Sequence, residues 1–262
     1  MRKGFSAALL VACFVTVALA VDQRQPATVG EYSGLSQVRT DGVPSPAGTV
    51  RCANVSGYYY YSGNFDSTSQ YANGLANEAD TMVNTGSQVY QPFSVVAEGR
   101  KKHLRVTGLC INSLDTAGAG IDNPTPYEVR VNAKIGSGGT LVCKGQATSS
   151  DHPTGRSGFG ITEYTHAVKI SHCKLAGSAN KGTQYHLNVE PQCFKNKVCS
   201  TARYFESTDD SNLGHIGPPT NRGDATLWNS AYFGEYWVAA CGIECFGELA
   251  SFSAGVTGRL TR

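Results

Sequence analysis

The sequence predicts an all-β protein, an antiparallel and jelly-roll-like sandwich of two sheets stapled by disulfides. Several segments alternate apolar and polar residues with a period of two, which is typical of strands that bury one face. Short clusters of glycine, asparagine, serine and proline separate these segments, as turns do. An even number of cysteines follows an export signal, and long helical periodicity is absent.

The N-terminus has the pattern of a secretory signal peptide. Arg2 and Lys3 precede an apolar stretch over residues 5–17, and an A-x-A site predicts cleavage after Ala20. Residues 1–20 are therefore expected to be removed on export, and the protein is expected to be secreted or extracellular, with the periplasm as an alternative. A competing interpretation is a bacterial lipobox ending at Cys13, but the residues after Cys13 stay apolar, whereas a lipoprotein usually turns polar there.

The mature chain is predicted to have a flexible lead-in over residues 21–50 and a single β domain over residues 51–262. Removal of the signal takes two of the 22 basic residues and none of the 20 acidic ones, which leaves a net charge of zero. A neutral chain lacks the basic footprint of a nucleic-acid binder and the excess positive charge that draws proteins to anionic membranes. No segment after the signal is apolar enough to span a membrane.

Eight cysteines remain in the mature chain, and in an exported protein an even number indicates disulfides. They are Cys52, Cys110, Cys143, Cys173, Cys193, Cys199, Cys241 and Cys245. Eight cysteines allow about 105 pairings, so spacing does not determine the connectivity. Proximity favours Cys193 with Cys199 and Cys241 with Cys245, which leaves Cys143 with Cys173 and Cys52 with Cys110 as longer links.

Four segments carry the clearest strand patterns. Residues 103–111 and 164–174 are strand candidates, and residues 127–135 alternate from Tyr127 to Ile135 with the odd positions apolar. Residues 184–190 alternate in the same way. The glycine-rich residues 136–139 predict a hairpin turn to a strand that begins near residue 140. One-sided alternation with short turns favours an antiparallel sandwich over a parallel α/β sheet.

Several of these motifs resemble, in the same order, those of exported bacterial β-sandwich proteins of uncharacterised activity. The resembling segments are residues 87–95, 127–130, 138–142, 154–156, 159–160, 163–164 and 182–191, within a stretch of roughly residues 85–255. The resemblance implies a β-sandwich fold and an exported location. It implies no activity and transfers no catalytic residues.

A polar row is the strongest candidate binding site. Alternation places His186, Asn188 and Glu190 on the outward, wet face of their strand, and Glu128 on the wet face of another. Such a face with nearby aromatic side chains can bind sugar hydroxyls, and Trp237 and the tyrosines of residues 58–61 supply aromatic surface. Glycoside hydrolysis would instead need two carboxylates at a set separation, and the sequence does not fix the strand order that would decide this. The main alternative is an ordinary solvated face.

Catalytic and metal signatures are missing. The chain has no G-x-S-x-G nucleophile elbow and no H-E-x-x-H motif. His166 and His172 lie on one predicted strand roughly 20 Å apart, so they cannot share one zinc ion. No cofactor and no metal is therefore expected.

These observations favour an exported, non-catalytic structural or binding module whose partner is a carbohydrate or a surface molecule. The alternative is a secreted polysaccharide hydrolase or lyase on the same scaffold. Two carboxylates in a concave groove would favour the enzyme, and a flat wet face would favour the module.

Overall fold

The architecture was obtained from a computed structural model, and all regular structure in its described residues is β-strand. The described residues are 57–63, 74–80, 85–115, 121–122, 125–158, 161–190, 192–193, 203–206, 215–218, 227–230, 237–239 and 252–262. The predicted signal peptide and lead-in, residues 1–50, lie outside these ranges and remain predictions. In the described ranges, no helix has the length and apolar character needed to cross a membrane.

The strands form two sheets. The first has the order β1 (Tyr58–Tyr61), β16 (Ala254–Thr261), β5 (His103–Asp115), β10 (Ile161–Ala176) and β9 (Ser149–Gly158), with β13 (Arg203–Glu206) joining β5 to β2 (Gly74–Ala76). The second has the order β6 (Ile121–Asp122), β12 (Gln192–Cys193), β3 (Glu78–Asp80), β4 (Thr85–Val95), β11 (Thr183–Val189), β7 (Thr125–Val131) and β8 (Thr140–Ala147). In addition, β14 (Leu227–Ser230) pairs with β4 and with β15 (Val238–Ala239).

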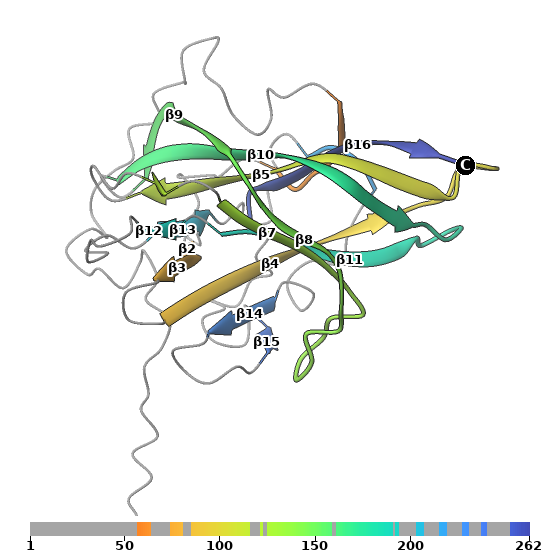
Figure 1. Ribbon diagram of the computed structural model, residues 1–262, viewed down its shortest axis with the longest axis horizontal. Helices are drawn as coiled ribbons and strands as arrows, with labels where there is room; N and C mark the ends of the chain where they lie inside the picture. The colour runs from red at the N-terminus through yellow and green to blue at the C-terminus, as the bar shows by residue number, and fades with distance from the viewer. Residues whose placement is uncertain are drawn as a thin grey trace, which may run out of the picture.

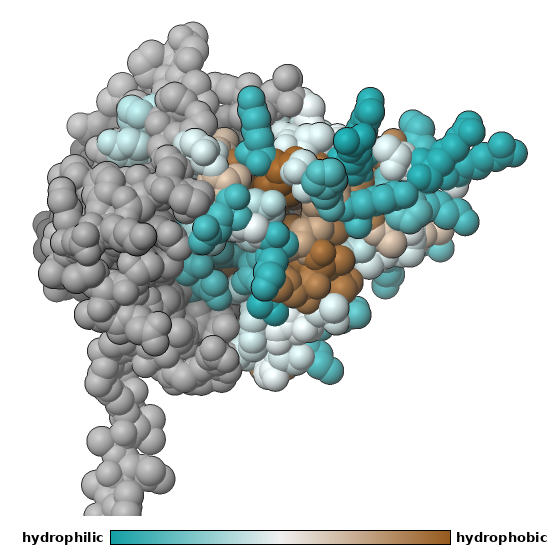
Figure 2. Space-filling view, in the orientation of Figure 1, coloured by the Kyte–Doolittle hydropathy of each residue, from teal (hydrophilic) through white to brown (hydrophobic). Residues whose placement is uncertain are grey.

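Eight longer strands build the sandwich and confirm the predicted fold class. Within the described residues, β16, β5, β10 and β9 make one four-stranded antiparallel sheet, and β4, β11, β7 and β8 make the other. Eight strands in two sheets is also the strand count of a jelly roll. The two sheets cross one over the other in Figure 1. In Figure 2, hydrophilic side chains gather at the end of the molecule where β5 begins and β16 ends.

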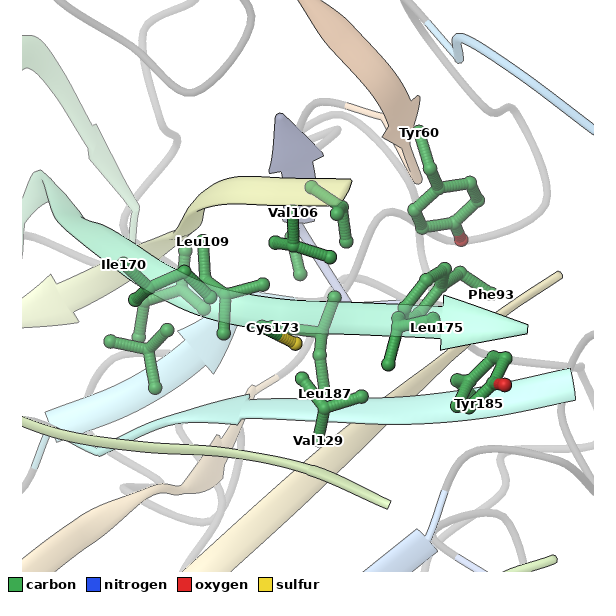
Figure 3. Packing of buried hydrophobic residues seen from close by; sticks show 14 of the residues in the cluster. Tyr60, Phe93, Val106, Leu109, Val129, Ile170, Cys173, Leu175, Tyr185 and Leu187 are labelled. Atoms are coloured by element: carbon green, nitrogen blue, oxygen red, sulfur yellow. The ribbon is translucent and has the colours of Figure 1, made fainter. Parts of the chain in front are cut away.

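The core lies between the two inner faces. Leu187 and Val129 from one sheet are fully buried, as is Leu175 from the other, and Figure 3 shows these side chains converging between the ribbons. Burying an aliphatic side chain of this size stabilises the fold by about 1.5–3 kcal/mol. The inner positions of β11 follow the alternation predicted for residues 184–190, with Tyr185, Leu187 and Val189 in the core, because a strand with one buried face has a period of two. In β5 the core positions change from even to odd numbers between Val106 and Leu109, where the pairing with β10 and β16 shifts register.

The strand observed in place of the predicted residues 127–135 ends earlier than the alternating pattern does. β7 ends at Val131, because Asn132 takes a left-handed conformation with φ of 59° and turns the chain away from the sheet. Ile135, which alternation placed on the buried face, is 61% exposed, and that prediction is wrong. The hairpin itself is confirmed, since β7 and β8 pair antiparallel from Val131 opposite Thr140.

One predicted disulfide links the two sheets. Cys143 on β8 is bonded to Cys173 on β10, as the sequence favoured, with Cα atoms 5.7 Å apart. Cys110 is also disulfide-bonded, whereas Cys52, the partner predicted for it, lies outside the described residues. The predicted pairs of Cys193 with Cys199 and of Cys241 with Cys245 likewise fall outside the described side chains. A disulfide is typical of an oxidising compartment.

Candidate functional site

A groove of ≈870 Å³ opens on the outer face of the second sheet. The strands β4, β11, β7 and β8 supply its floor, and the loop between β7 and β8 forms one wall together with Trp237. This volume is within the range of small-molecule sites in proteins. Its lining includes the polar and aromatic side chains of Gln88, Glu128, Arg130, Lys144, Asn188, Glu190 and Trp237.

Three of the four predicted site residues meet in this groove. Glu128 lies directly opposite Asn188 in the pairing of β7 with β11, and Glu190 follows two residues along, so all three project from the same face. The fourth, His186, lies opposite Arg130 on that face but is not among the residues that line the groove.

The face that carries them is not wet, which corrects the sequence prediction. The exposed fractions are 1% for His186, 1% for Asn188, 7% for Glu190 and 9% for Glu128. Trp237 packs against the Tyr90 ring at 4.7 Å between centroids and covers part of the sheet. The alternation therefore identified the correct side of the strand, but other segments of the chain shield that side from solvent.

Glu128 is held at the centre of a hydrogen-bond network. Its Oε2 accepts hydrogen bonds from Arg130 Nε at 3.1 Å and Nη2 at 3.0 Å, and its Oε1 accepts one from the Tyr90 hydroxyl. Burial, and then the charge of Glu128, raises the pKa of Tyr90 well above its ordinary value of 10.0, so the phenol keeps its proton. The Tyr90 hydroxyl is also 2.9 Å from Gln88 Oε1, and Gln88 Nε2 donates to Glu190 Oε2 at 3.0 Å.

Asn188 is fixed by a side chain inserted between two strands. Asn77 Oδ1 accepts a hydrogen bond from the Val89 amide on β4 at 3.1 Å, and Asn77 Nδ2 donates to the Val189 carbonyl on β11 at 2.9 Å. Asn188 uses both amide protons, donating to Asn77 Oδ1 at 2.6 Å and to the Val89 carbonyl at 2.8 Å. Its Oδ1 is buried and has no hydrogen-bond partner in the described part of the chain.

Trp237 is docked on the β7–β8 loop by close backbone contacts. The Gly136 amide donates to the Trp237 carbonyl at 2.8 Å, and a Cβ at Gly138 would lie 2.4 Å from the indole. The Arg130 guanidinium carbon is 5.1 Å from the centroid of the Trp237 ring, which places a cation over the indole. Trp237 therefore forms a rigid aromatic wall beside the charged floor.

The alternation of residues along the strands identifies more of the residues at the groove than were predicted from it. Gln88, Tyr90 and Arg130 lie on the same faces of their strands as the groove, so the period of two already marks them. Trp237 was noted only as aromatic surface, because nothing in its neighbouring sequence indicates that it docks on a loop about 100 residues earlier in the chain.

The histidines do not form a metal site in the described part of the chain, where no three His, Cys, Asp or Glu residues are grouped to hold an ion. His166 is fully buried, with Nε2 2.7 Å from Ser113 Oγ. His172 is exposed at a bulge of β10, where its φ is 65°.

Comparisons with known proteins found no matching family model, no matching curated protein and no matching solved structure. The resemblance to exported bacterial β-sandwich proteins therefore remains a prediction.

Proposed function

We propose that this chain is an exported binding module that takes a carbohydrate in the groove. The observation that supports this best is the groove lining, in which the Trp237 ring stands beside fixed hydrogen-bonding groups from three strands. A sugar ring offers an apolar face of C–H groups and a rim of hydroxyls. An aromatic wall suits the apolar face, and carboxylate and amide groups suit the hydroxyls.

Asn188 gives the ligand a specific point of attachment. A buried acceptor without a partner costs about 1–3 kcal/mol, and a donated hydrogen bond removes that cost. The Asn188 Oδ1 can only accept a hydrogen bond, and both protons of its amide are already donated within the protein, so a ligand must supply a donor to it. Asn188 lines the groove but its Oδ1 is closed to solvent, so a ligand hydroxyl can donate to it only after a neighbouring side chain moves aside, and an ether oxygen at the same place has no proton to donate.

The second candidate is a glycoside hydrolase, which the placement of the two carboxylates favours. Glu128 and Glu190 are diagonal neighbours on adjacent antiparallel strands. Diagonal neighbours are about 7–8 Å apart at the backbone. Inverting glycosidases hold their carboxyl groups about 6.5–9.5 Å apart, and glutamate side chains from two such backbone positions can reach that separation.

Binding is preferred to hydrolysis because both carboxylates already accept hydrogen bonds within the protein. Both oxygens of Glu128 accept hydrogen bonds from Tyr90 and Arg130, and Glu190 accepts one from Gln88. A general acid or base must reach the reacting proton directly or through one water. Carboxylates held in this way act most simply as fixed acceptors for ligand hydroxyls.

The test is a titration of the mature chain, residues 21–262, with cellohexaose, xylohexaose, mannohexaose, laminarihexaose and chitohexaose by isothermal calorimetry. We expect one of these sugars to bind, and Trp237→Ala and Lys144→Ala to weaken that binding, the former by about tenfold or more. Lys134→Ala, which changes an exposed residue outside the groove lining, is the matched control and should bind as the wild type does. Binding that all three variants leave unchanged would place the ligand elsewhere and refute the proposal.

The same samples decide between module and enzyme. After prolonged incubation, chromatography of each hexasaccharide should show no shorter products. Products that disappear in both Glu128→Gln and Glu190→Gln would establish the hydrolase instead. No binding and no products with any of the five sugars would end both proposals for these ligands.

A further inference from the structure

A row of three like charges crosses the outer face of the first sheet. Arg105 on β5 pairs in register with Arg259 on β16 and with Lys174 on β10, and all three side chains are exposed. Side chains directly opposite each other on neighbouring strands lie about 4.5–5.5 Å apart at Cβ, and like charges there destabilise a sheet. The fold alone gives no reason for this row.

The neighbouring turn extends the positive charge. Arg100, Lys101 and Lys102 lie in the connection between β4 and β5, directly before the strand that carries Arg105, and are also exposed. We call the six cations Arg100, Lys101, Lys102, Arg105, Lys174 and Arg259 the basic end. Figure 2 shows hydrophilic side chains crowded at this end of the molecule.

The described residues around the basic end carry little negative charge. None of its six cations forms an ion pair with them, and the one acidic residue of the turn, Glu98, pairs through its backbone with Lys101. Lys174 Nζ donates to the main-chain oxygen of Arg262 at 3.5 Å. A mature chain with balanced total charge thus concentrates positive charge in one place, and such a patch sets up a local field whatever the net charge is.

We propose that the basic end binds a polyanionic polysaccharide, a chain whose sulfate or carboxylate groups repeat along its length. The row of Arg259, Arg105 and Lys174 presents cations at the spacing of neighbouring strands, about 4.7–4.9 Å, across an open sheet face. None of these residues lines the groove, so this site is independent of the one proposed above.

The absence of apolar and aromatic side chains favours a polysaccharide over other polyanions. Within the described chain the exposed large hydrophobic residues are Ile135, Val142 and Ile216, and none belongs to the basic end. Stable attachment to a lipid surface usually adds an apolar anchor to the basic patch. Single-stranded nucleic acid is bound by aromatic side chains on which the bases stack. A polysaccharide with repeated anionic groups requires neither.

The test is binding of the mature chain to heparin, polygalacturonate and dextran by calorimetry between 25 and 200 mM NaCl. We expect heparin or polygalacturonate to bind with an affinity that falls steeply as salt rises, and dextran not to bind. The double variant Arg105→Gln/Lys174→Gln should weaken binding about tenfold or more and reduce the slope of log affinity against log salt by about two. Its matched control, Lys134→Glu, removes the same two units of positive charge at an exposed residue outside both the basic end and the groove lining, and should bind nearly as the wild type does.

Single-stranded DNA and phosphatidylglycerol vesicles complete the comparison, and thermal unfolding verifies that the double variant and its control both fold. No binding to either acidic polysaccharide at 25 mM NaCl would overturn the proposal, as would equal losses of affinity in the double variant and in Lys134→Glu. DNA or vesicles bound as tightly as the acidic polysaccharides would also overturn it, in favour of a general polyanion surface.

Discussion

Breaking the bond between Cys143 and Cys173 is expected to lower the free energy of unfolding by about 3–4 kcal/mol. The two residues are 30 positions apart in the sequence. For a loop of this length, chain entropy predicts a loss of about 12 cal/mol/K in the unfolded state, which amounts to about 3.6 kcal/mol at 25 °C. Cys173 is also buried in the core, so its replacement by alanine should cost about 1 kcal/mol more through lost packing.

Urea unfolding followed by tryptophan fluorescence measures this effect in Cys143→Ala, Cys173→Ala and the double variant, with free thiols blocked to prevent exchange. Either single substitution breaks the bond, so each should lose the full cross-link contribution. The double variant should then be only slightly less stable than Cys173→Ala. The resulting coupling energy should be about 3–4 kcal/mol. A coupling below about 1 kcal/mol would refute the reasoning, because the bond would then not restrain the unfolded chain.

Three further predictions concern the core, the hairpin and the tyrosines. Leu187→Ala should destabilise the protein by about 2–5 kcal/mol in urea, since Leu187 is fully buried between the sheets; a loss below about 1 kcal/mol would contradict its position. Gly139→Ala should cost about 1–3 kcal/mol, because Gly139 has a φ of 61° and a Cβ there would lie 2.2 Å from the Val131 carbonyl oxygen; unchanged stability would rule out this loop geometry. Burial raises the pKa of Tyr58 and of Tyr90 above the ordinary value of 10.0. As pH rises past 10, the unfolded chain therefore loses these protons before the folded protein does. The free energy of unfolding should have its full value below pH 10 and fall above it. Phenolate absorbance should therefore appear for these residues only as the protein unfolds, and early titration in the folded protein would contradict their burial.

Sequence periodicity predicted on which face of a strand each residue lies better than it predicted whether that residue is exposed to solvent. Along β11 the alternation correctly put Leu187 in the core and Asn188 on the opposite face. It also implied that the opposite face meets water, and this was wrong because exposure depends on what lies over the sheet. A period of two depends on the geometry of a single strand, whereas the covering by Trp237 depends on chain segments far away in the sequence.

The distribution of charge over the surface likewise could not be derived from the sequence alone. The neutral total charge of residues 21–262 hides the row formed by Arg259, Arg105 and Lys174, because these residues are about 70 or more positions apart in sequence and become neighbours only through strand pairing. Arg100, Lys101 and Lys102 are consecutive in the sequence, but they were not singled out from it. The extension of this run across three strands could not be derived without the order of the sheet.

The Asn77 side chain works as a substitute for a peptide unit. Its amide offers one carbonyl and one NH₂ group at the place where β4 and β11 separate, and so continues the hydrogen-bond ladder for one step while holding the two backbones apart. Aspartate lacks the donor, glutamine is one carbon too long, and alanine would leave the two strands without a bridge. The width of the groove floor is therefore set by the side chain of Asn77. In any variant that allows β4 and β11 to pair directly here, the backbone distance between Gln88 and Glu190 should shorten.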